Sequence, residues 1–244
     1  MKNFLKVNFC FNKEEIYKNI KDYLNNNQVE YICAANANTV TVANNDEMFR
    51  TIVNNSGFNI CDGSQIALFY NLFNNEKIKS YPGPDFFIDY ISKKEFKSLF
   101  LGSTEEIHLG LKKNLKKFNE KIDEMPFMTL PFLDINEFDY KAIANKINNE
   151  NVDLIWVSLG APKQEIFMSK IKPFLTRGVM IGVGAAFTFY GSEKQKRAPI
   201  IFRKLKIEWL HRIVTTRSFP KRFRNQLFYM PQLLLKDLFK RLFK

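Results

Sequence analysis

Two apolar runs decide the fold of this chain, Leu154-Ile-Trp-Val-Ser-Leu-Gly160 and Val179-Met-Ile-Gly-Val-Gly184. Between them, Ala161-Pro-Lys-Gln-Glu165 opens a segment, 164–174, with a helical pattern. Short apolar runs that alternate with a helix are typical of parallel strands. Because ligands of parallel α/β sheets bind beyond the carboxyl ends of strands, the two glycine-ended runs predict a shared ligand cleft.

The rest of the chain alternates in the same way. The predicted strands are 7–11, 31–34, 58–61 and 99–102. The predicted helices are 13–25 (capped by Asn12), 46–53, 65–73, 86–92, 105–118 and 136–149. This alternation predicts an α/β fold, a Rossmann-like, largely parallel sheet with helices on both faces.

The net charge of +12 is concentrated at one end of the chain. Residues 194–244 hold 15 Lys or Arg against two acidic residues, a net +13, whereas residues 1–193 carry −1. A neutral body with a basic tail indicates one binding face for an anionic partner. We therefore predict an α/β core at 1–193 and a basic, helical C-terminal appendage at 194–244.

The cysteines and the N-terminal residues favour the cytoplasm. Cys10, Cys33 and Cys61 are odd in number and have no C-x-x-C spacing, which argues against a disulfide scaffold and a zinc site. Residues 1–7 lack the apolar core of a signal peptide, and no uncharged apolar run is long enough to span a bilayer.

The appendage ends in an amphipathic pattern that has two interpretations. Apolar residues fall near one helical face at Leu227, Met230, Leu234, Leu238 and Leu242. Lysines recur every four residues at Lys236, Lys240 and Lys244. The pattern fits a helix in an anionic membrane interface, and it also fits a helix packed on the core.

Several polar residues at strand ends have both a structural and a chemical interpretation. Asp62 follows a strand and precedes Gly63, which suits either a turn or a general base. Asn36 follows another strand and could cap the loop or bind a sugar hydroxyl. Gln164 and Glu165 open a helix, where free N–H groups favour anions and where Glu is also common for structural reasons.

These residues also carry a family resemblance. The runs G-A-P-K-Q-E, G-V-G-A-A-F, R-A-P and E-W-L-H-R, in residues 160–212, resemble the WecG/TagA/CpsF family of bacterial glycosyltransferases. Upstream blocks agree in the same order at Asn36, Asp62-Gly63, Gly83-x-Asp85 and Leu101-Gly102. The resemblance covers about 7–224.

The resemblance implies a role for each matched residue. Asp62 is expected to be the catalytic base, and Asn36 is expected among the catalytic residues. The residues expected to bind the nucleotide sugar are Gly63, Gly102, Gly160, Pro162, Gln164, Glu165, Gly184 and Arg197. Arginines of the appendage, Arg212, Arg222 and Arg224, are expected to complete the active site.

The departing nucleotide must be stabilised by positive charge. The sequence has no Asp-x-Asp motif, with which many glycosyltransferases hold a divalent metal. Guanidinium groups match phosphate geometry and offer the alternative. We therefore expect neither a metal nor another cofactor, with the UDP-sugar as donor substrate.

Three positions depart from the family pattern. They are Ala34 in place of a threonine, Ser80 in place of an arginine, and Thr188 in place of an aspartate. They leave the reaction class intact but leave open the donor and acceptor sugars. The two histidines, His108 and His211, have no partner at metal or triad spacing, so a structural role is expected.

The leading hypothesis is an inverting, metal-independent glycosyltransferase. It would move a sugar of the N-acetylmannosamine type, or a related hexose, from UDP to an undecaprenyl-pyrophosphate-linked sugar in cell-surface polysaccharide or teichoic acid synthesis. The expected place is the cytoplasm, peripheral on the anionic inner face of the membrane, with homo-oligomerisation left open.

Two hypotheses from other classes compete. The basic appendage with Phe202, Trp209 and Phe219 interleaved suits a nucleic-acid-binding protein, although no recognisable module for nucleic acid is present. A nicotinamide enzyme is disfavoured because Gly182-x-Gly184 is only a fragment of a dinucleotide fingerprint and lies late in the chain.

Overall fold

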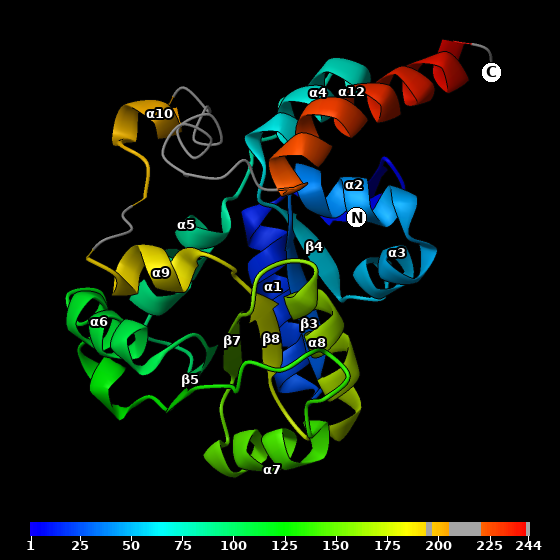
Figure 1. The fold of residues 1–244 in the computed structure, drawn as a ribbon. Helices are drawn as coiled ribbons and strands as arrows, with labels where there is room; N and C mark the ends of the chain where they lie inside the picture. The colour runs from blue at the N-terminus through cyan, green and yellow to red at the C-terminus, as the bar shows by residue number, and fades with distance from the viewer. Residues whose placement is uncertain (194–196, 205–220, 243–244) are drawn as a thin grey trace.

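The structure is a computed structural model that describes the backbone of residues 1–193, 197–204 and 221–242. Within these residues, one sheet of eight strands has the order β1-β2-β4-β3-β8-β7-β5-β6 (Figure 1). The strands are β1 (Lys2–Phe4), β2 (Val7–Cys10), β3 (Glu30–Ala35), β4 (Phe58–Cys61), β5 (Ser98–Gly102), β6 (Phe127–Met128), β7 (Leu154–Ser158) and β8 (Val179–Gly182). Only β1 and β2 pair antiparallel, so the predicted largely parallel sheet is confirmed.

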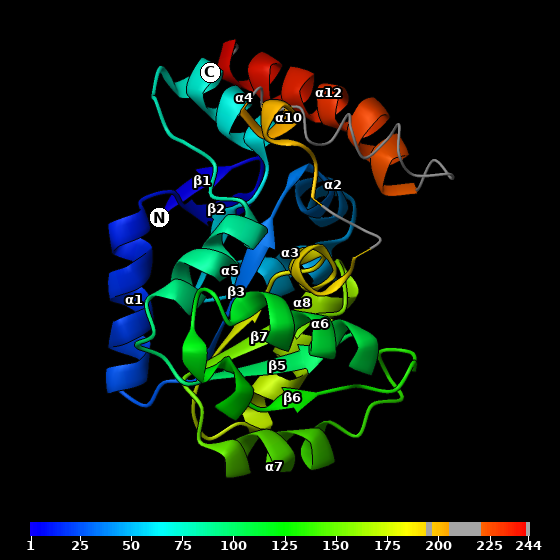
Figure 2. The ribbon, with the colours of Figure 1, turned by 90° about the vertical axis from the view of Figure 1, so that its left-hand side faces the viewer.

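Helices cover both faces of the sheet (Figure 2). They are α1 (Lys13–Asn25), α2 (Ala37–Asn45), α3 (Glu47–Asn54), α4 (Ser64–Asn74), α5 (Gly83–Ser92), α6 (Glu105–Leu115), α7 (Tyr140–Glu150), α8 (Lys163–Ile171), α9 (Ala186–Gly191), α10 (Ile200–Lys204) and α12 (Lys221–Leu242). Two short 3-10 helices are Glu120–Glu124 and Lys172–Phe174. The core over one face includes α1, α5, α6 and α9, and α2, α3, α7 and α8 cover the other.

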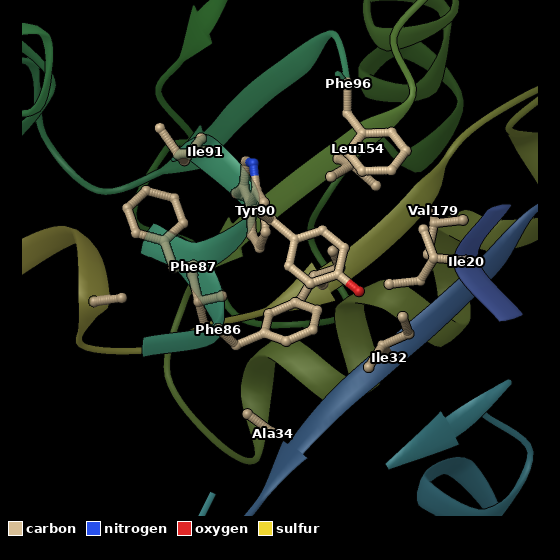
Figure 3. Packing of buried hydrophobic residues seen from close by; sticks show 14 of the residues in the cluster. Ile20, Ile32, Ala34, Phe86, Phe87, Tyr90, Ile91, Phe96, Leu154 and Val179 are labelled. Carbon is tan, nitrogen blue, oxygen red and sulfur yellow. The ribbon is translucent and has the colours of Figure 1, made fainter. Parts of the chain in front are cut away.

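The alternation of strand side chains divides the core between the two faces. In β3, Ile32 and Ala34 belong to the cluster that α5 covers, whereas Tyr31 and Cys33 belong to the cluster on the opposite face. Figure 3 shows the first cluster, with the rings of α5 lying over the strands. Phe87 of α5 packs edge-on against Trp156 of β7, with ring centroids 5.0 Å apart. The alternation of side chains along each strand thus sets the two layers, and both faces of these strands are buried.

The first helix agrees with the sequence prediction in both its bounds and its cap. α1 spans Lys13–Asn25, and Asn12 accepts hydrogen bonds from the backbone N–H groups of Glu14 and Glu15. Ile16 and Ile20 are fully buried. A capping side chain and an apolar stripe are local features, which is why this helix is readable from sequence.

The segment after β3, treated above as a loop, is a helix. α2 begins at Ala37, and Asn36 is its N-cap. Its sequence is rich in Asn and in β-branched residues, which have low helix propensity. Tertiary packing outweighs that propensity, because Ala37, Val40 and Ala43 are buried in the core.

Other helix bounds differ from the prediction by a few residues. α5 begins at Gly83 instead of residue 86, because prolines are tolerated in the first turn of a helix. α6 ends at Leu115 and α7 begins at Tyr140, so both are shorter than predicted. The helix after β7 changes from α to 3-10 geometry at Lys172, next to Pro173.

The C-terminal helix α12 packs on the core along one stripe, and its expected place in a membrane interface stays a prediction. Met230 and Leu234 are buried in a core cluster, and α12 contacts α2. Leu235, Leu238 and Phe239 are exposed. Among the residues described, no helix combines the length and apolar character needed to cross a membrane.

Candidate functional site

The candidate site lies where two neighbouring strands send the chain to opposite faces of the sheet. β3 leads into α2 on one face, and its neighbour β8 leads into α9 on the other. Ligands of open α/β sheets bind at such a switch point. The start of α5 closes on the same place: a Cβ added to Gly83 would lie 3.5 Å from the Ala34 Cβ and 3.7 Å from the Val183 carbonyl oxygen.

Asp62 lies directly after β4, with donors from two other elements bound to its carboxylate. Oδ1 accepts the backbone N–H of Gly83 at 2.6 Å, and Oδ2 accepts the Asn36 side-chain amide at 3.2 Å. The Gly83 N–H belongs to the first turn of α5 and has no partner within its helix. A carboxylate at that helix end is also favoured by the helix dipole. The two bonds fix the orientation of the carboxylate.

Asn36 links this carboxylate to the backbone of α2. Its Oδ1 accepts from the N–H groups of Asn38 and Thr39, and its Nδ2 donates to Asp62. The capping bonds therefore orient the amide so that its donor faces the carboxylate. The capping role of Asn36 is confirmed, its contact with Asp62 was not predicted, and binding of a sugar hydroxyl stays a prediction.

Two glycines lie beside these groups. A Cβ on Gly63 would lie 3.4 Å from the Cα of Asn36, and one on Gly83 would lie 3.5 Å from Asp62 Oδ1. A side chain on Gly83 would occupy space beside the carboxylate, and one on Gly63 would occupy space beside Asn36.

Gln164 and Glu165 form a buried pair behind the loop that follows β8. Gln164 Oε1 accepts the Gly184 N–H at 3.1 Å, and Gln164 Nε2 donates to Glu165 Oε1 at 2.9 Å. Gly184 has a positive φ of 51°, and its carbonyl accepts from the Ser158 hydroxyl at 2.8 Å. The pair thus fixes the backbone of one loop of the site.

Burial has a strong effect on Glu165. Its side chain is 0% exposed, and Oε2 has no hydrogen-bond partner. This desolvation raises the pKa of the Glu165 carboxyl to about 7. Its carboxylate does not reach solvent, so in this structure it contributes to the site through Gln164.

Glycines with positive φ shape the ends of β5 and β7. Gly102 has φ +93°, and a Cβ there would lie 2.8 Å from the Ser158 carbonyl oxygen. Gly160 has φ +75° with open space around its Cβ position, and the Ala161–Pro162 bond that follows is cis. The four predicted loop residues Gly102, Gly160, Pro162 and Gly184 therefore all lie at the carboxyl edge of the sheet.

Arg197 joins two blocks that are far apart in sequence. It forms a bidentate ion pair with Asp85 in the first turn of α5, with one Nη–Oδ distance of 3.1 Å. The Arg197 side chain is 10% exposed, and that of Asp85 is 43% exposed. Because Gly83 and Asp85 share one helical turn, Arg197 steadies the turn that binds Asp62.

The appendage arginines are only partly placed. Arg212 lies outside the described residues. Arg222 and Arg224 belong to α12, but their side chains fall outside the described part of the chain. Their expected role at the leaving phosphates stays a prediction.

The three departures from the family pattern fall on different elements. Ala34 lies in β3 beside Gly83, Ser80 precedes α5 and Thr188 lies in α9. His108 is buried, and its Nε2 lies 2.6 Å from the Gly102 carbonyl oxygen, in agreement with the structural role expected for it. Burial lowers its pKa.

The three cysteines form no disulfide with one another. Cys10, Cys33 and Cys61 are buried free thiols. Across the described ranges, no three His, Cys, Asp or Glu side chains are grouped so as to hold a metal ion.

Some site residues could not be found from sequence reasoning. The Gly83 N–H and the Asp85–Arg197 pair belong to blocks that the sequence marked, but nothing local assigned them these contacts. Gly182 was also missed as a packing residue. A Cβ there would lie 2.9 Å from both Gln164 Nε2 and Met168 Cε, so a larger residue would displace the end of the Gln164 or Met168 side chain.

Fold and site together define an α/β protein with a candidate site at the switch point, built around an oriented carboxylate. The model of the glycosyl transferase WecG/TagA/CpsF family matches residues 3–244. The chain therefore belongs to this family and is a glycosyltransferase. Its family membership favours the first hypothesis over nucleic-acid binding and nicotinamide chemistry.

Alignments with named relatives cover most of the chain. It is similar to N-acetylglucosaminyldiphosphoundecaprenol N-acetyl-beta-D-mannosaminyltransferases from three bacteria. The enzyme of Bacillus spizizenii is 25% identical over 209 residues, 84% of this chain and 77% of the relative. The enzyme of Bacillus subtilis strain 168 is 26% identical over 202 residues, which are 79% of this chain and 76% of the relative. The enzyme of Staphylococcus aureus strain MRSA252 is 25% identical over 203 residues, which are 81% of this chain and 78% of the relative.

Proposed function

We propose that this glycosyltransferase moves an N-acetylmannosamine-type sugar from UDP to an N-acetylglucosamine linked through a diphosphate to undecaprenol. The names of the relatives support the acceptor and the sugar. The observation that carries the chemistry is the Asp62 carboxylate, oriented at the switch point by Asn36 and Gly83. The product enters cell-surface polysaccharide or teichoic acid synthesis.

The reaction is a single displacement with inversion. Asp62 takes the proton of the acceptor hydroxyl as its oxygen bonds to the anomeric carbon of the donor sugar. The bond between that carbon and the β-phosphate oxygen breaks, and its electron pair leaves with UDP. Asn36 and Gly83 hold the base in place while the proton moves, as orientation-dependent catalysis requires.

The donor lies along the carboxyl edge of the sheet. Its diphosphate approaches the loops at Gly102, Gly160 and Gly184, where glycine backbone permits close contact. Arg212, Arg222 and Arg224 stabilise the charge on departing UDP without a metal ion. Gln164 and Glu165 hold the Gly184 loop from behind.

The acceptor lipid places the enzyme at the inner face of the cell membrane as a peripheral protein. The basic residues of 194–244 supply electrostatic attraction to anionic lipids, at about 1 kcal/mol for each residue near the surface. Exposed Leu235 and Phe239 of α12 add apolar contact.

Asp62→Asn tests the central assignment. This variant should fold and bind UDP, but its turnover should fall by a factor on the order of 100 or more, because the amide cannot take the proton. Turnover is measured with UDP-N-acetylmannosamine and a short-chain lipid-linked N-acetylglucosamine. As a matched control, Asp123→Asn changes an exposed carboxylate paired with Lys116 and should leave turnover unchanged. Turnover near that of the wild type in Asp62→Asn would remove Asp62 from the mechanism.

A further inference from the structure

Helix α4 presents an apolar stripe to solvent directly after the candidate base. Its eleven residues, Ser64–Asn74, include no charged side chain. Leu68 is 61% exposed and Leu72 is 74% exposed. Residues four apart lie on the same helix face, so the two leucines form one continuous stripe.

This stripe is not the side on which α4 packs. Ile66, Ala67 and Tyr70 of the same helix are buried in the core cluster around β1 and β2. The core therefore already holds one apolar side of α4, and Leu68 and Leu72 extend away from it. Single exposed leucines are ordinary on protein surfaces, but a paired stripe on an uncharged helix indicates a contact surface.

A second exposed apolar stripe lies at the same end of the molecule. Leu235, Leu238 and Phe239 of α12 are 54%, 37% and 59% exposed. Both views place α4 and α12 together at the end opposite α7 (Figures 1 and 2). The buried residues of the two helices, Tyr70 and Leu234 among them, belong to one core cluster.

Positive charge borders these stripes. Lys77 and Lys79 are exposed just beyond the end of α4, and Lys236 is exposed on α12. The segment 194–244 carries +13 in total. Apolar side chains bordered by lysines fit an anionic lipid surface, in which the apolar groups enter the interface and the lysines meet headgroups. A second copy of the same face would instead bring like charges together.

We propose that Leu68 and Leu72 of α4 dock on an anionic bilayer together with the exposed stripe of α12. The proposal rests on the proposed function, because a lipid-linked acceptor is presented at that surface. α4 begins at Ser64, two residues after Asp62. Leu68 and Leu72 follow Ser64 by four and eight residues, a rise of about 6 Å and about 12 Å along the helix. A docked α4 therefore holds the base close to the headgroup layer.

Vesicle flotation with the full chain tests the surface. Vesicles of phosphatidylglycerol and phosphatidylcholine are compared with vesicles of phosphatidylcholine alone. The variant Leu68→Glu/Leu72→Glu should bind the anionic vesicles at least tenfold more weakly than the wild type. The matched control Leu109→Glu, an exposed leucine of α6 at 69%, should bind as the wild type does. Equal binding by the α4 variant and the wild type would overturn the proposal.

A gain-of-signal variant covers the case in which the double glutamate variant fails to fold. Leu72→Trp should show a blue-shifted and stronger tryptophan emission when anionic vesicles are added, because tryptophan favours the membrane interface. No spectral change, at vesicle concentrations that bind the protein, would contradict the docking of α4.

Sedimentation velocity without lipid gives a further outcome. If Leu68→Glu/Leu72→Glu dissociates an oligomer of the wild type, the stripe is a contact between copies and the proposal fails.

The flotation assay contains no donor or acceptor, so it does not depend on the reaction. If transfer to a short-chain acceptor is absent in the wild type while flotation follows the expected pattern, the proposed function fails and the surface remains. If Leu68→Glu/Leu72→Glu keeps transfer to the short-chain acceptor but loses it with full-length acceptor in vesicles, both proposals hold.

Discussion

At the scale of single residues, Glu165 is the clearest case of a side chain whose role depends on its surroundings. Its position at the start of α8 suited an anion-binding loop, but the carboxyl is buried and bound to Gln164. Burial raises its pKa to about 7. The native protein therefore resists ionisation of this group, whereas the unfolded chain ionises near the ordinary value of 4.5.

This difference makes stability depend on pH. Below pH 4.5 the Glu165 carboxyl is protonated in both the native and the unfolded state, so it does not change the free energy of unfolding. As pH rises toward 7, the unfolded state loses its proton first, so the native state loses stability relative to it. Each pKa unit corresponds to 1.36 kcal/mol, so the loss is on the order of 3 kcal/mol by pH 8.

Glu165→Gln should remove this pH-dependent loss of stability, because an amide resembles the protonated carboxyl and keeps an acceptor for Gln164. Relative to the variant, the wild type should lose stability between pH 5 and pH 8, as measured by urea unfolding at both values. The exposed Glu106→Gln should follow the wild type and serves as the control. Parallel pH dependence of Glu165→Gln and wild type would show that Glu165 is solvated or paired.

At the scale of elements, the start of α5 depends on a segment that follows α9. Arg197 binds Asp85 through both guanidinium nitrogens, and Gly83 in the same turn binds Asp62. Bidentate Arg–carboxylate pairs have defined geometry, so Arg197 acts on the position of the base through the helix.

Arg197→Ala should therefore loosen the turn and lower kcat/KM by a factor on the order of 10 while the protein stays folded, since small displacements of a catalytic group are costly. Steady-state kinetics with the short-chain acceptor give this value. Lys113→Ala, which breaks an exposed pair with Glu193, is the matched control and should have no effect. In a double-mutant cycle with Asp85→Asn, additive effects would show that the Arg197–Asp85 pair does not act as a unit.

At the scale of the whole molecule, charge is divided between a near-neutral core and the basic segment 194–244. The division at residue 193 stays a prediction, although Met230 and Leu234 show that part of this segment packs on the core. If its arginines stabilise the leaving diphosphate, no divalent cation is needed for the reaction.

Transfer should then continue in EDTA at a rate within about twofold of the untreated enzyme, since a guanidinium can supply the charge that a metal supplies elsewhere. The rate is measured after dialysis against EDTA, with and without added magnesium or manganese. Loss of activity in EDTA that either ion restores would show that a metal takes part.

The sequence by itself determined six of the eight strands in the described residues, where α1 begins and ends, and which polar residues follow strands. It did not predict the short strands β1 (Lys2–Phe4) and β6 (Phe127–Met128). The predicted features are local: a short apolar run, a helical period of 3.6 residues, a capping Asn12, or a glycine at a strand end is visible within a short window. For the same reason Asp62 and Asn36 could be predicted as neighbours of the sheet edge without any coordinates.

Only the tertiary structure decided which of these residues meet. Asn36 and Asp62 are 26 residues apart, and Asp85 and Arg197 are 112 apart, so their contacts depend on strand order and helix placement. The helix after Asn36 was missed because burial outweighs its poor intrinsic propensity. Burial of Glu165 likewise follows from the packing of other elements on both sides of α8. The local sequence pattern does not reveal that packing.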